Sequence, residues 1–236
     1  MLLKNLIKNS PSDIENINIR NLALDSRKVK KGDLFFALKG NKLDGASFLG
    51  QAFKKGAKAA ICSKNIKIKN KKKNMHIIKV KNPIESLTYA CSQFFKNKPK
   101  NIIAVTGTNG KSSVADFFYQ IFSKNGLPVA SIGTLGVKYN KKIKKSNLTS
   151  LDIISLHKEL ANLRKLGIEN VIIEASSHGL AQGRLNGIIF KAGIFTNFSQ
   201  DHLDYHKTMK SYLNSKLLLF KKILGRNKFV IVDKSI

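Results

Sequence analysis

Apolar and polar positions along this chain predict short buried strands that alternate with amphipathic helices. Apolar, largely β-branched runs at residues 102–105, 171–173 and 229–232 are typical of buried strands. Residues 114–122 and 152–166 instead repeat their apolar positions at the spacing of a helix. Because strands and helices alternate, the pattern predicts an α/β fold with a mainly parallel sheet.

A polar break divides this pattern into two units. The NKPK sequence at residues 97–100 separates residues 1–97 from residues 98–236, and we expect a domain boundary there. The first unit is predicted to hold a small amphipathic helix at 1–8, strands at 17–19, 21–24, 34–38, 57–62 and 77–80, and helices at 48–55 and 84–95. The second adds a strand and turn at 131–139, a strand at 192–195 and a helix at 212–224. The lysine-rich segments 67–73 and 141–145 are predicted to be solvated loops.

A glycine-rich turn follows the first strand of the second unit. Residues 106–113 have the sequence TGTNGKSS, and a strand, a glycine loop and a helix in this order form a cradle for phosphate. Lys111 is placed to reach the β- and γ-phosphates, and the hydroxyl of Ser112 to ligate Mg²⁺. The strict pattern has glycine where this chain has Val105, and the extra glycine is Gly107. The alternative, an ordinary strand–helix turn with a lysine at its rim, fits less well with Gly-Lys-Ser directly after a buried strand.

Two more strands end in polar residues at the edge of the sheet where ligands bind in open α/β folds. Glu174 ends one of them and can hold Mg²⁺ directly or through water. Residues 196–206, TNFSQDHLDYH, follow the other. The adjacent Ser177 and His178 permit a hydrolase interpretation, although the chain has no Gly-x-Ser-x-Gly elbow.

The acidic and histidine residues of segment 196–206 also permit a zinc interpretation. Asp201, His202, Asp204 and His206 stand close together in sequence but lack the helical His-Glu-x-x-His pattern. A third interpretation makes these histidines structural. Beside a phosphate loop, a Mg²⁺-linked role is favoured over both.

Composition argues against several other functions. The formal net charge is +29, but only five of the 43 basic residues are arginine, the side chain that best makes bidentate phosphate and base contacts. Lysine and asparagine enrichment is what an AT-rich coding sequence produces, so the charge does not require a nucleic-acid partner. No apolar run is long enough to span a membrane, and the N-terminus does not resemble a signal peptide. Cys62 and Cys91, which lack metal-ligand spacing, are expected to be reduced thiols in a cytoplasmic protein.

These motifs together resemble the Mur ligase family, most closely its MurE type. The resemblance is carried by residues 106–113, by 174–179 with 182–184, and by the nearly diagnostic segment 196–206. Residues 24–27 and 32–35 resemble the family's UDP-binding domain, so the resemblance covers the whole chain. It implies a small N-terminal α/β UDP-binding domain, 1–97, followed by an incomplete P-loop-type, mainly parallel α/β ATPase domain, 98–236.

The resemblance implies an ATP- and Mg²⁺-dependent amide ligase of peptidoglycan precursor synthesis. In that family ATP phosphorylates the D-Glu carboxylate of UDP-MurNAc-L-Ala-D-Glu. The amine of a diamino acid, meso-diaminopimelate or L-lysine, then attacks the acyl phosphate. A cytoplasmic monomer with no nucleic-acid or membrane partner is expected.

Roles for individual residues also come from the resemblance. It implies that ATP is bound by Gly107, Thr108, Asn109, Gly110, Lys111, Ser112 and Ser113. It implies that metal is held by Ser112, Glu174, His202 and a carbamylated Lys216, of which the last three act in catalysis with Lys111. UDP contacts are implied at Leu24, Ser26, Asn41, Lys42 and Leu43, and muramyl-dipeptide contacts at Thr149, Ser150, Ser176, Gln182 and Arg184.

Two departures from the family pattern shape the remaining expectations. The usual Thr-Thr-Pro is Thr149-Ser150-Leu151 here, which keeps the hydroxyl. The family's C-terminal, amino-acid-binding domain has no counterpart in these residues, so we expect little or no ligation by the chain alone and an exposed edge on its central sheet. A non-catalytic nucleotide- or UDP-sugar-binding remnant is the main alternative, and a basic nucleic-acid-binding protein ranks below both.

Overall fold

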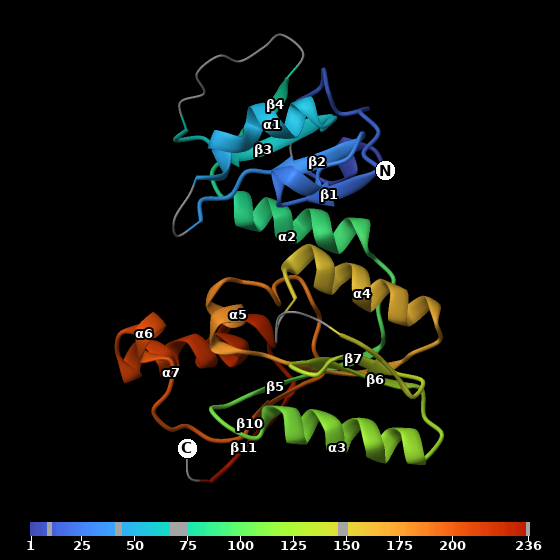
Figure 1. Cartoon of the computed structure of the whole chain (residues 1–236), viewed down its shortest axis with the longest axis vertical. Coiled ribbons are helices and arrows are strands. Elements are labelled where there is room, and N and C mark those ends of the chain that lie inside the picture. Colours follow the sequence, from blue (N-terminus) through green and yellow to red (C-terminus); the bar gives the residue numbers. More distant parts are fainter. Residues whose placement is uncertain (9–10, 41–43, 67–74, 146–150, 235–236) are drawn as a thin grey trace. The chain divides into compact units, whose positions relative to one another are not determined.

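Two α/β units follow one another along the chain. The computed structural model describes residues 1–8, 11–40, 44–66, 75–145 and 151–234, and it divides into unit 1, Met1–Phe94, and unit 2, Phe95–Ile236 (Figure 1). The polar break predicted at residues 97–100 lies just after this division. No helix among the described residues is long and apolar enough to cross a bilayer.

Within its described residues, unit 1 is built on a parallel sheet with the strand order β1-β2-β3-β4. Its strands are β1 (Asn21–Ala23), β2 (Asp33–Phe36), β3 (Ala59–Ser63) and β4 (His76–Val80), and its α-helices are α1 (Leu49–Lys54) and α2 (Pro83–Phe94). Short 3₁₀ turns form at η1 (Leu3–Asn5), η2 (Ser26–Lys28) and η3 (Gly45–Phe48). Phe35 and Ala60 pack with Leu49 and Ala52 of α1, so this helix covers one face of the sheet.

Two predictions for the start of unit 1 were wrong. Residues 1–8 form only the 3₁₀ turn η1 instead of an amphipathic helix, and residues 17–19 form no strand. The two segments instead meet at an isolated antiparallel bridge between Leu2 and Asn18. A segment this short is a poor isolated helix, and pairing with a neighbouring extended segment satisfies its backbone groups instead.

Within its described residues, unit 2 has a sheet with the order β11-β10-β5-β9-β6-β7-β8. The strands are β5 (Asn101–Thr106), β6 (Val129–Gly133), β7 (Gly136–Tyr139), β8 (Lys142–Lys144), β9 (Asn170–Glu174), β10 (Ala192–Phe195) and β11 (Phe229–Val232). All neighbours are parallel except β6-β7 and β7-β8. The helices are α3 (Lys111–Lys124), α4 (Ile153–Lys165), α5 (Ser177–Ala181), α6 (Leu203–His206), α7 (Met209–Leu218) and the π-helical turn η4 (Leu219–Ile223).

Both faces of this sheet are covered, as the apolar strands require. Ile102 and Ala104 pack in one core cluster with the apolar face of α4, while Val105 packs in another with Ala115 of α3. Figure 1 shows α3 and α4 on opposite sides of the sheet. Since successive side chains of a strand point to opposite faces, β5 contributes to both layers.

The strand order explains why the predicted polar strand ends meet. β5 lies between β10 and β9, with Thr106 paired to Phe195 on one side and Val105 paired to Glu174 on the other. Because the three strands are parallel, the segments that follow them leave the same edge of the sheet. The phosphate loop is therefore flanked by Glu174 and by the segment after β10.

Three details of unit 2 differ from the sequence prediction or extend it. The predicted loop 141–145 contains β8, an exposed lysine-rich strand, because the turn after β7 lets the chain pair back on it. The predicted helix 212–224 begins earlier, at Met209, where the Thr208 side chain accepts a hydrogen bond from Ser211 N. β11 pairs with β10 alone among the described residues and is exposed along its whole length.

Candidate functional site

The loop between β5 and α3 has the backbone shape of a phosphate cradle. Gly107 and Gly110 have φ angles of 151° and 79°, in the region that favours glycine, and α3 starts directly after Gly110. A Cβ on Gly107 would lie 1.9 Å from Thr196 Oγ1, so a glycine is needed there for the two loops to approach. The helix N-terminus directs its unpaired N–H groups and its positive dipole end toward this loop.

The segment after β10 holds the phosphate loop in place through paired hydrogen bonds. Asn109 N donates to Asn197 Oδ1 at 2.8 Å, and Asn197 Nδ2 donates to Asn109 O at 3.2 Å. Thr108 Oγ1 donates to Ser199 O at 3.1 Å and accepts from Ser199 N at 3.0 Å. Segment 196–206 therefore helps to fix the conformation of the phosphate loop.

Lys111 folds back over its own loop. Its Nζ donates to Gly107 O at 2.9 Å and to Thr108 O at 2.7 Å. Burial lowers the pKa of Lys111, while the carboxylates of Glu174 and Asp201 oppose that shift. The ammonium group is thus held over the loop by neutral carbonyl groups. A charged phosphate oxygen would be a stronger hydrogen-bond acceptor and would take their place.

Glu174 is buried, with 2% of its surface exposed, and it accepts hydrogen bonds from two elements. Ser112 Oγ donates to its Oε2 at 2.8 Å. From the end of β6, Thr134 N donates to Oε1 and Thr134 Oγ1 to Oε2, both at 3.1 Å. The carboxylate predicted as a metal ligand is therefore oriented from both sides.

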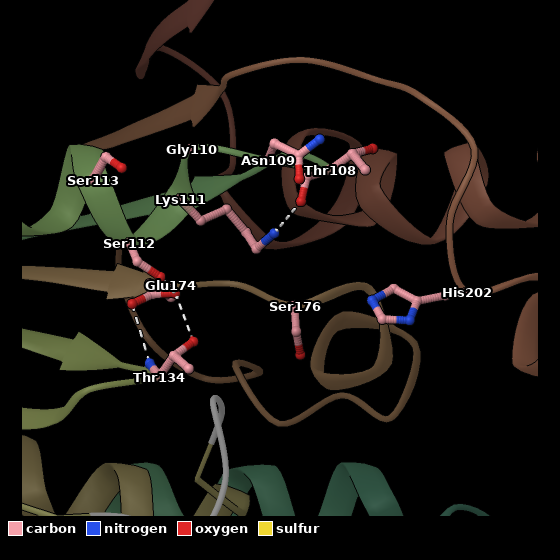
Figure 2. A pocket seen from close by; sticks show the side chains of 10 residues that line it. All are labelled: Thr108, Asn109, Gly110, Lys111, Ser112, Ser113, Thr134, Glu174, Ser176 and His202. Carbon is pink, nitrogen blue, oxygen red and sulfur yellow. Dashed lines mark hydrogen bonds between the residues drawn. The ribbon is translucent and has the colours of Figure 1, made fainter.

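A pocket of about 290 Å³ opens between these groups (Figure 2). Its lining residues are Thr108, Asn109, Gly110, Lys111, Ser112, Ser113, Thr134, Glu174, Ser176 and His202. Every one except Thr134 is a residue that the sequence singled out. Gly107 is a buried part of the same loop and does not line the pocket.

Lys216 lies against the same loop from the side of α7. It is 1% exposed, its Nζ donates to Gly107 O at 2.6 Å, and it sits 4.3 Å from the ring centroid of Tyr212. Burial, followed by the positive charge of Lys111, lowers its pKa to about 7. Near neutral pH a large fraction of this side chain is therefore a neutral amine.

The predicted metal ligands are only partly gathered. Ser112 and Glu174 touch each other, and His202 lines the same pocket, with its Nε2 3.4 Å from Asp201 Oδ2. Across the residues that the structure describes, no three His, Cys, Asp or Glu side chains form a preformed metal cluster. A hydroxyl and a carboxylate beside a phosphate cradle nevertheless suit Mg²⁺, which binds few protein oxygens and completes its shell with phosphate and water.

Family comparisons agree with this geometry. Residues 18–98 match the model described as "Mur ligase family, catalytic domain", and residues 105–236 match the "Mur ligase middle domain". The chain belongs to the Mur ligase family. The family resemblance expected from the motifs is thereby confirmed, as is the predicted fold class.

Similar curated proteins place this Mur ligase chain near one branch of the family. It is 41% identical over 223 residues to the UDP-N-acetylmuramoyl-L-alanyl-D-glutamate--2,6-diaminopimelate ligase of Brucella melitensis, covering 94% of this chain and 45% of that protein. It is 44% identical over 225 residues to the ligase of the same name from Rickettsia conorii, covering 93% and 46%. The chain thus spans about half the length of the curated relatives it matches.

Solved structures give the same picture. A UDP-N-acetylmuramoyl-L-alanyl-D-glutamate--2,6-diaminopimelate ligase matches with a TM-score of 0.81 at 29% identity, over 100% of this chain and 47% of that one. The MurF ligase of Thermotoga maritima, solved in complex with ADP, matches with a TM-score of 0.61 at 20% identity, over 92% and 46%. The second likeness shows the fold alone.

In this Mur ligase chain the hydroxyl of Ser177 is hydrogen-bonded to His206, a different histidine from the adjacent His178 of the hydrolase interpretation. Nε2 of the His206 ring lies 2.9 Å from Ser177 Oγ, and Nδ1 of the same ring lies 3.2 Å from Ser215 Oγ. Ser215 donates its only hydroxyl hydrogen to Ser211 O at 2.9 Å, so Nδ1 of His206 must carry a proton and Nε2 accepts from Ser177. Burial lowers the pKa of His206, which agrees with this neutral tautomer. His206 thus links α5 to α7. Both of its ring nitrogens are engaged in hydrogen bonds, so neither is available to bind zinc.

The residues implied for the UDP and muramyl contacts lie in both units. In unit 1, Leu24 is half-buried and Ser26 Oγ donates to Gln51 Oε1 at 2.6 Å. In unit 2, Ser176 caps α5 by accepting from Gly179 N at 3.0 Å. Arg184 donates through Nε and Nη2 to Gln182 Oε1 at 3.0 and 2.7 Å. Five further implied contacts, at Asn41, Lys42, Leu43, Thr149 and Ser150, lie outside the described residues.

Proposed function

We propose that this chain carries the nucleotide- and UDP-precursor-binding half of an ATP-dependent amide ligase of peptidoglycan synthesis. The proposed reaction joins 2,6-diaminopimelate to UDP-MurNAc-L-Ala-D-Glu through an acyl phosphate. The observation that supports it most is the pocket in which the phosphate loop, Lys111 and the Ser112–Glu174 pair meet. The names of the similar Brucella and Rickettsia ligases favour diaminopimelate over lysine.

Phosphoryl transfer mainly requires positioning and charge neutralisation, and this loop supplies both. Lys111 exchanges its two carbonyl partners for β- and γ-phosphate oxygens of ATP. The N–H groups at the start of α3 bind phosphate oxygens as well. These contacts would position the γ-phosphoryl group for attack by the D-Glu carboxylate.

For Mg²⁺, the proposed ligands are the Ser112 hydroxyl, Glu174, His202 and a carbamate on Lys216. When bound, the ion would neutralise negative charge on the transferred phosphoryl group. The lowered pKa of Lys216 supports the carbamate, because only a neutral amine adds to CO₂. In that step the Nζ lone pair of the neutral amine forms a bond to the carbon of CO₂, the π electrons of one C=O bond move onto its oxygen, and a proton leaves Nζ to solvent, which turns a neutral amine into an anionic oxygen ligand.

Recognition of the UDP-linked dipeptide is assigned to separate groups of residues in each unit. Leu24 and Ser26, with Asn41, Lys42 and Leu43, are proposed to contact the uridine diphosphate. Ser176, Gln182 and Arg184, with Thr149 and Ser150, are proposed to contact the muramyl dipeptide. Because ATP and UDP-linked precursors are intracellular metabolites, we place the reaction in the cytoplasm, and we expect a monomer without a nucleic-acid partner.

Isothermal titration calorimetry tests the proposal on the full 236-residue chain. ATP is titrated with and without Mg²⁺, and UDP-MurNAc-L-Ala-D-Glu is titrated separately. Binding of both, with ATP binding strengthened by Mg²⁺, is the expected result. A folded chain that binds UDP-MurNAc-L-Ala-D-Glu but not ATP would overturn the ligase assignment, and a chain that binds neither would overturn the whole proposal.

A further inference from the structure

Thr134 lines the pocket of Figure 2 but was not among the residues singled out by the sequence. It follows Gly133, the last residue of β6, and β6 pairs with β9, the strand that ends in Glu174. Its N–H and its hydroxyl each donate to a different oxygen of the Glu174 carboxylate, at 3.1 Å. One residue thus contacts both oxygens and, together with Ser112, fixes the rotation of the carboxylate group about its terminal bond.

Gly133 makes these two hydrogen bonds from Thr134 to Glu174 possible. A Cβ at that position would lie 1.9 Å from Glu174 Oε1 and 2.3 Å from its Cδ, far inside van der Waals contact. The carboxylate therefore packs directly on the backbone of β6. The Gly133–Thr134 dipeptide forms a seat that fits a carboxylate at this place in the sheet and leaves no room for a side chain.

The hydrogen bonds also have a direction. A serine hydroxyl has one hydrogen and two lone pairs, and the hydrogen of Ser112 is given to Glu174 Oε2. What Ser112 presents to the pocket is then its lone pairs, which are the part of a hydroxyl that binds a cation. The orientation of that hydroxyl depends on Glu174, and the orientation of Glu174 depends on Thr134.

We propose that Thr134 is a positioning residue for divalent-cation binding, acting through Glu174 and Ser112. The inference rests on the proposed function, because it assumes that the cation enters this pocket with a nucleotide. Partners of metal-ligating groups typically change metal affinity 10- to 100-fold when removed. Thr134 belongs to this class although it need not touch the cation.

The test compares Thr134→Val with Thr134→Ser. Valine keeps the size and the backbone N–H but removes the hydroxyl donor, whereas serine keeps the donor. Mn²⁺ affinity is measured by electron paramagnetic resonance in the presence of ADP, and ADP affinity without metal by calorimetry. We expect Thr134→Val to weaken Mn²⁺ binding about 10-fold or more with metal-free ADP affinity unchanged, and Thr134→Ser to remain within about threefold of wild type.

Thr88→Val is the matched control. Thr88 also donates its hydroxyl, at 2.9 Å, but to Ile84 O of its own helix in unit 1. A variant Thr134→Val whose Mn²⁺ affinity equals that of Thr88→Val would overturn the inference while leaving the proposed function intact. Equal losses of Mn²⁺ and metal-free ADP binding would also overturn it, since they indicate general damage to the loop. Absence of Mn²⁺-dependent ADP binding by the folded wild-type chain would overturn both.

Discussion

Nζ of Lys216 donates a 2.6 Å hydrogen bond to the carbonyl oxygen of Gly107, a residue 109 positions earlier in the chain. Lys111 donates to the same oxygen at 2.9 Å. Two lysine side chains from α3 and α7 therefore meet at one carbonyl of the phosphate loop. The positive charge of either one disfavours a positive charge on the other, which adds to the effect of burial on the pKa of Lys216.

Stability should depend on pH through Lys216. Its pKa is about 7 in the folded chain and 10.5 as an unperturbed lysine, so between these values the unfolded chain binds a proton that the folded chain does not. This group therefore makes the free energy of unfolding rise from pH 7 toward pH 10, by at most about 1.4 kcal/mol per pH unit, with no such dependence below pH 7. Lys216→Met should abolish that rise.

Urea unfolding at pH 7, 8 and 9 measures this difference between wild type and Lys216→Met. Lys210→Met is the control, because Lys210 lies on the same helix but is exposed. Parallel pH profiles for wild type and Lys216→Met would contradict the low pKa.

Lys111→Ala should weaken ATP binding about 10- to 100-fold, since a hydrogen bond to a charged group contributes about 1.5–3 kcal/mol. The loop itself should survive, because Asn197 bonds its backbone at Asn109 and Ser199 bonds the Thr108 side chain, both independently of the lysine. Calorimetry with ATP and Mg²⁺ measures the loss. Lys124→Ala, an exposed lysine in the last turn of the same helix, should bind like wild type. Similar affinities for the two variants would remove Lys111 from the phosphate site.

Gly133→Ala should be destabilising, because its methyl group would meet Glu174 Oε1 at 1.9 Å. Overpacking of this kind typically costs about 1–3 kcal/mol. Gly50→Ala in α1 is the matched control: a Cβ there meets nothing within 4 Å, and alanine favours a helix by up to about 1 kcal/mol. Thermal unfolding monitored by circular dichroism should show opposite shifts for the two variants. A wild-type melting temperature for Gly133→Ala would mean that Glu174 moves away without cost.

At high concentration, a polypeptide of residues 1–236 should aggregate through strand β11. Its four residues, Phe229, Val230, Ile231 and Val232, are 79%, 51%, 57% and 46% exposed, and an apolar sheet edge is a template for further strands. Val230→Lys places a charge on that edge and should lower the aggregated fraction seen by light scattering at high protein concentration. Lys228→Arg, a charge-conserving change beside β11, should leave aggregation as it is. Equal aggregation of Val230→Lys and wild type would show that aggregation occurs through a surface other than β11.

Sequence reasoning found most of the pocket for two physical reasons. The phosphate loop is a local motif, so Lys111 and Ser112 could be recognised from their neighbours in the chain. Glu174 and His202 were found because parallel strands release their following segments at one edge of the sheet, and the order β10-β5-β9 places those segments together.

Thr134 and Lys216 show where that reasoning stops. One of the two hydrogen bonds from Thr134 to Glu174 comes from a backbone N–H, which every residue except proline possesses. The residue type at position 134 therefore carries little signal in the sequence. Lys216 was identified only through the family resemblance, because α7 has almost no segregated apolar face from which its burial could be predicted. The strand β8 was missed since lysines at a sheet edge resemble a solvated loop.

The reciprocal bonds between Asn109 and Asn197 and between Thr108 and Ser199 have a consequence for motion. Each loop has a side chain bonded to the backbone of the other, so neither loop can open without breaking these hydrogen bonds. The two loops should therefore open and close as one cooperative unit. The amide hydrogens of Asn109 and Ser199 should then exchange with solvent deuterium at a common rate. Nucleotide bound to the first loop would slow exchange in the second, about 90 residues farther along the chain.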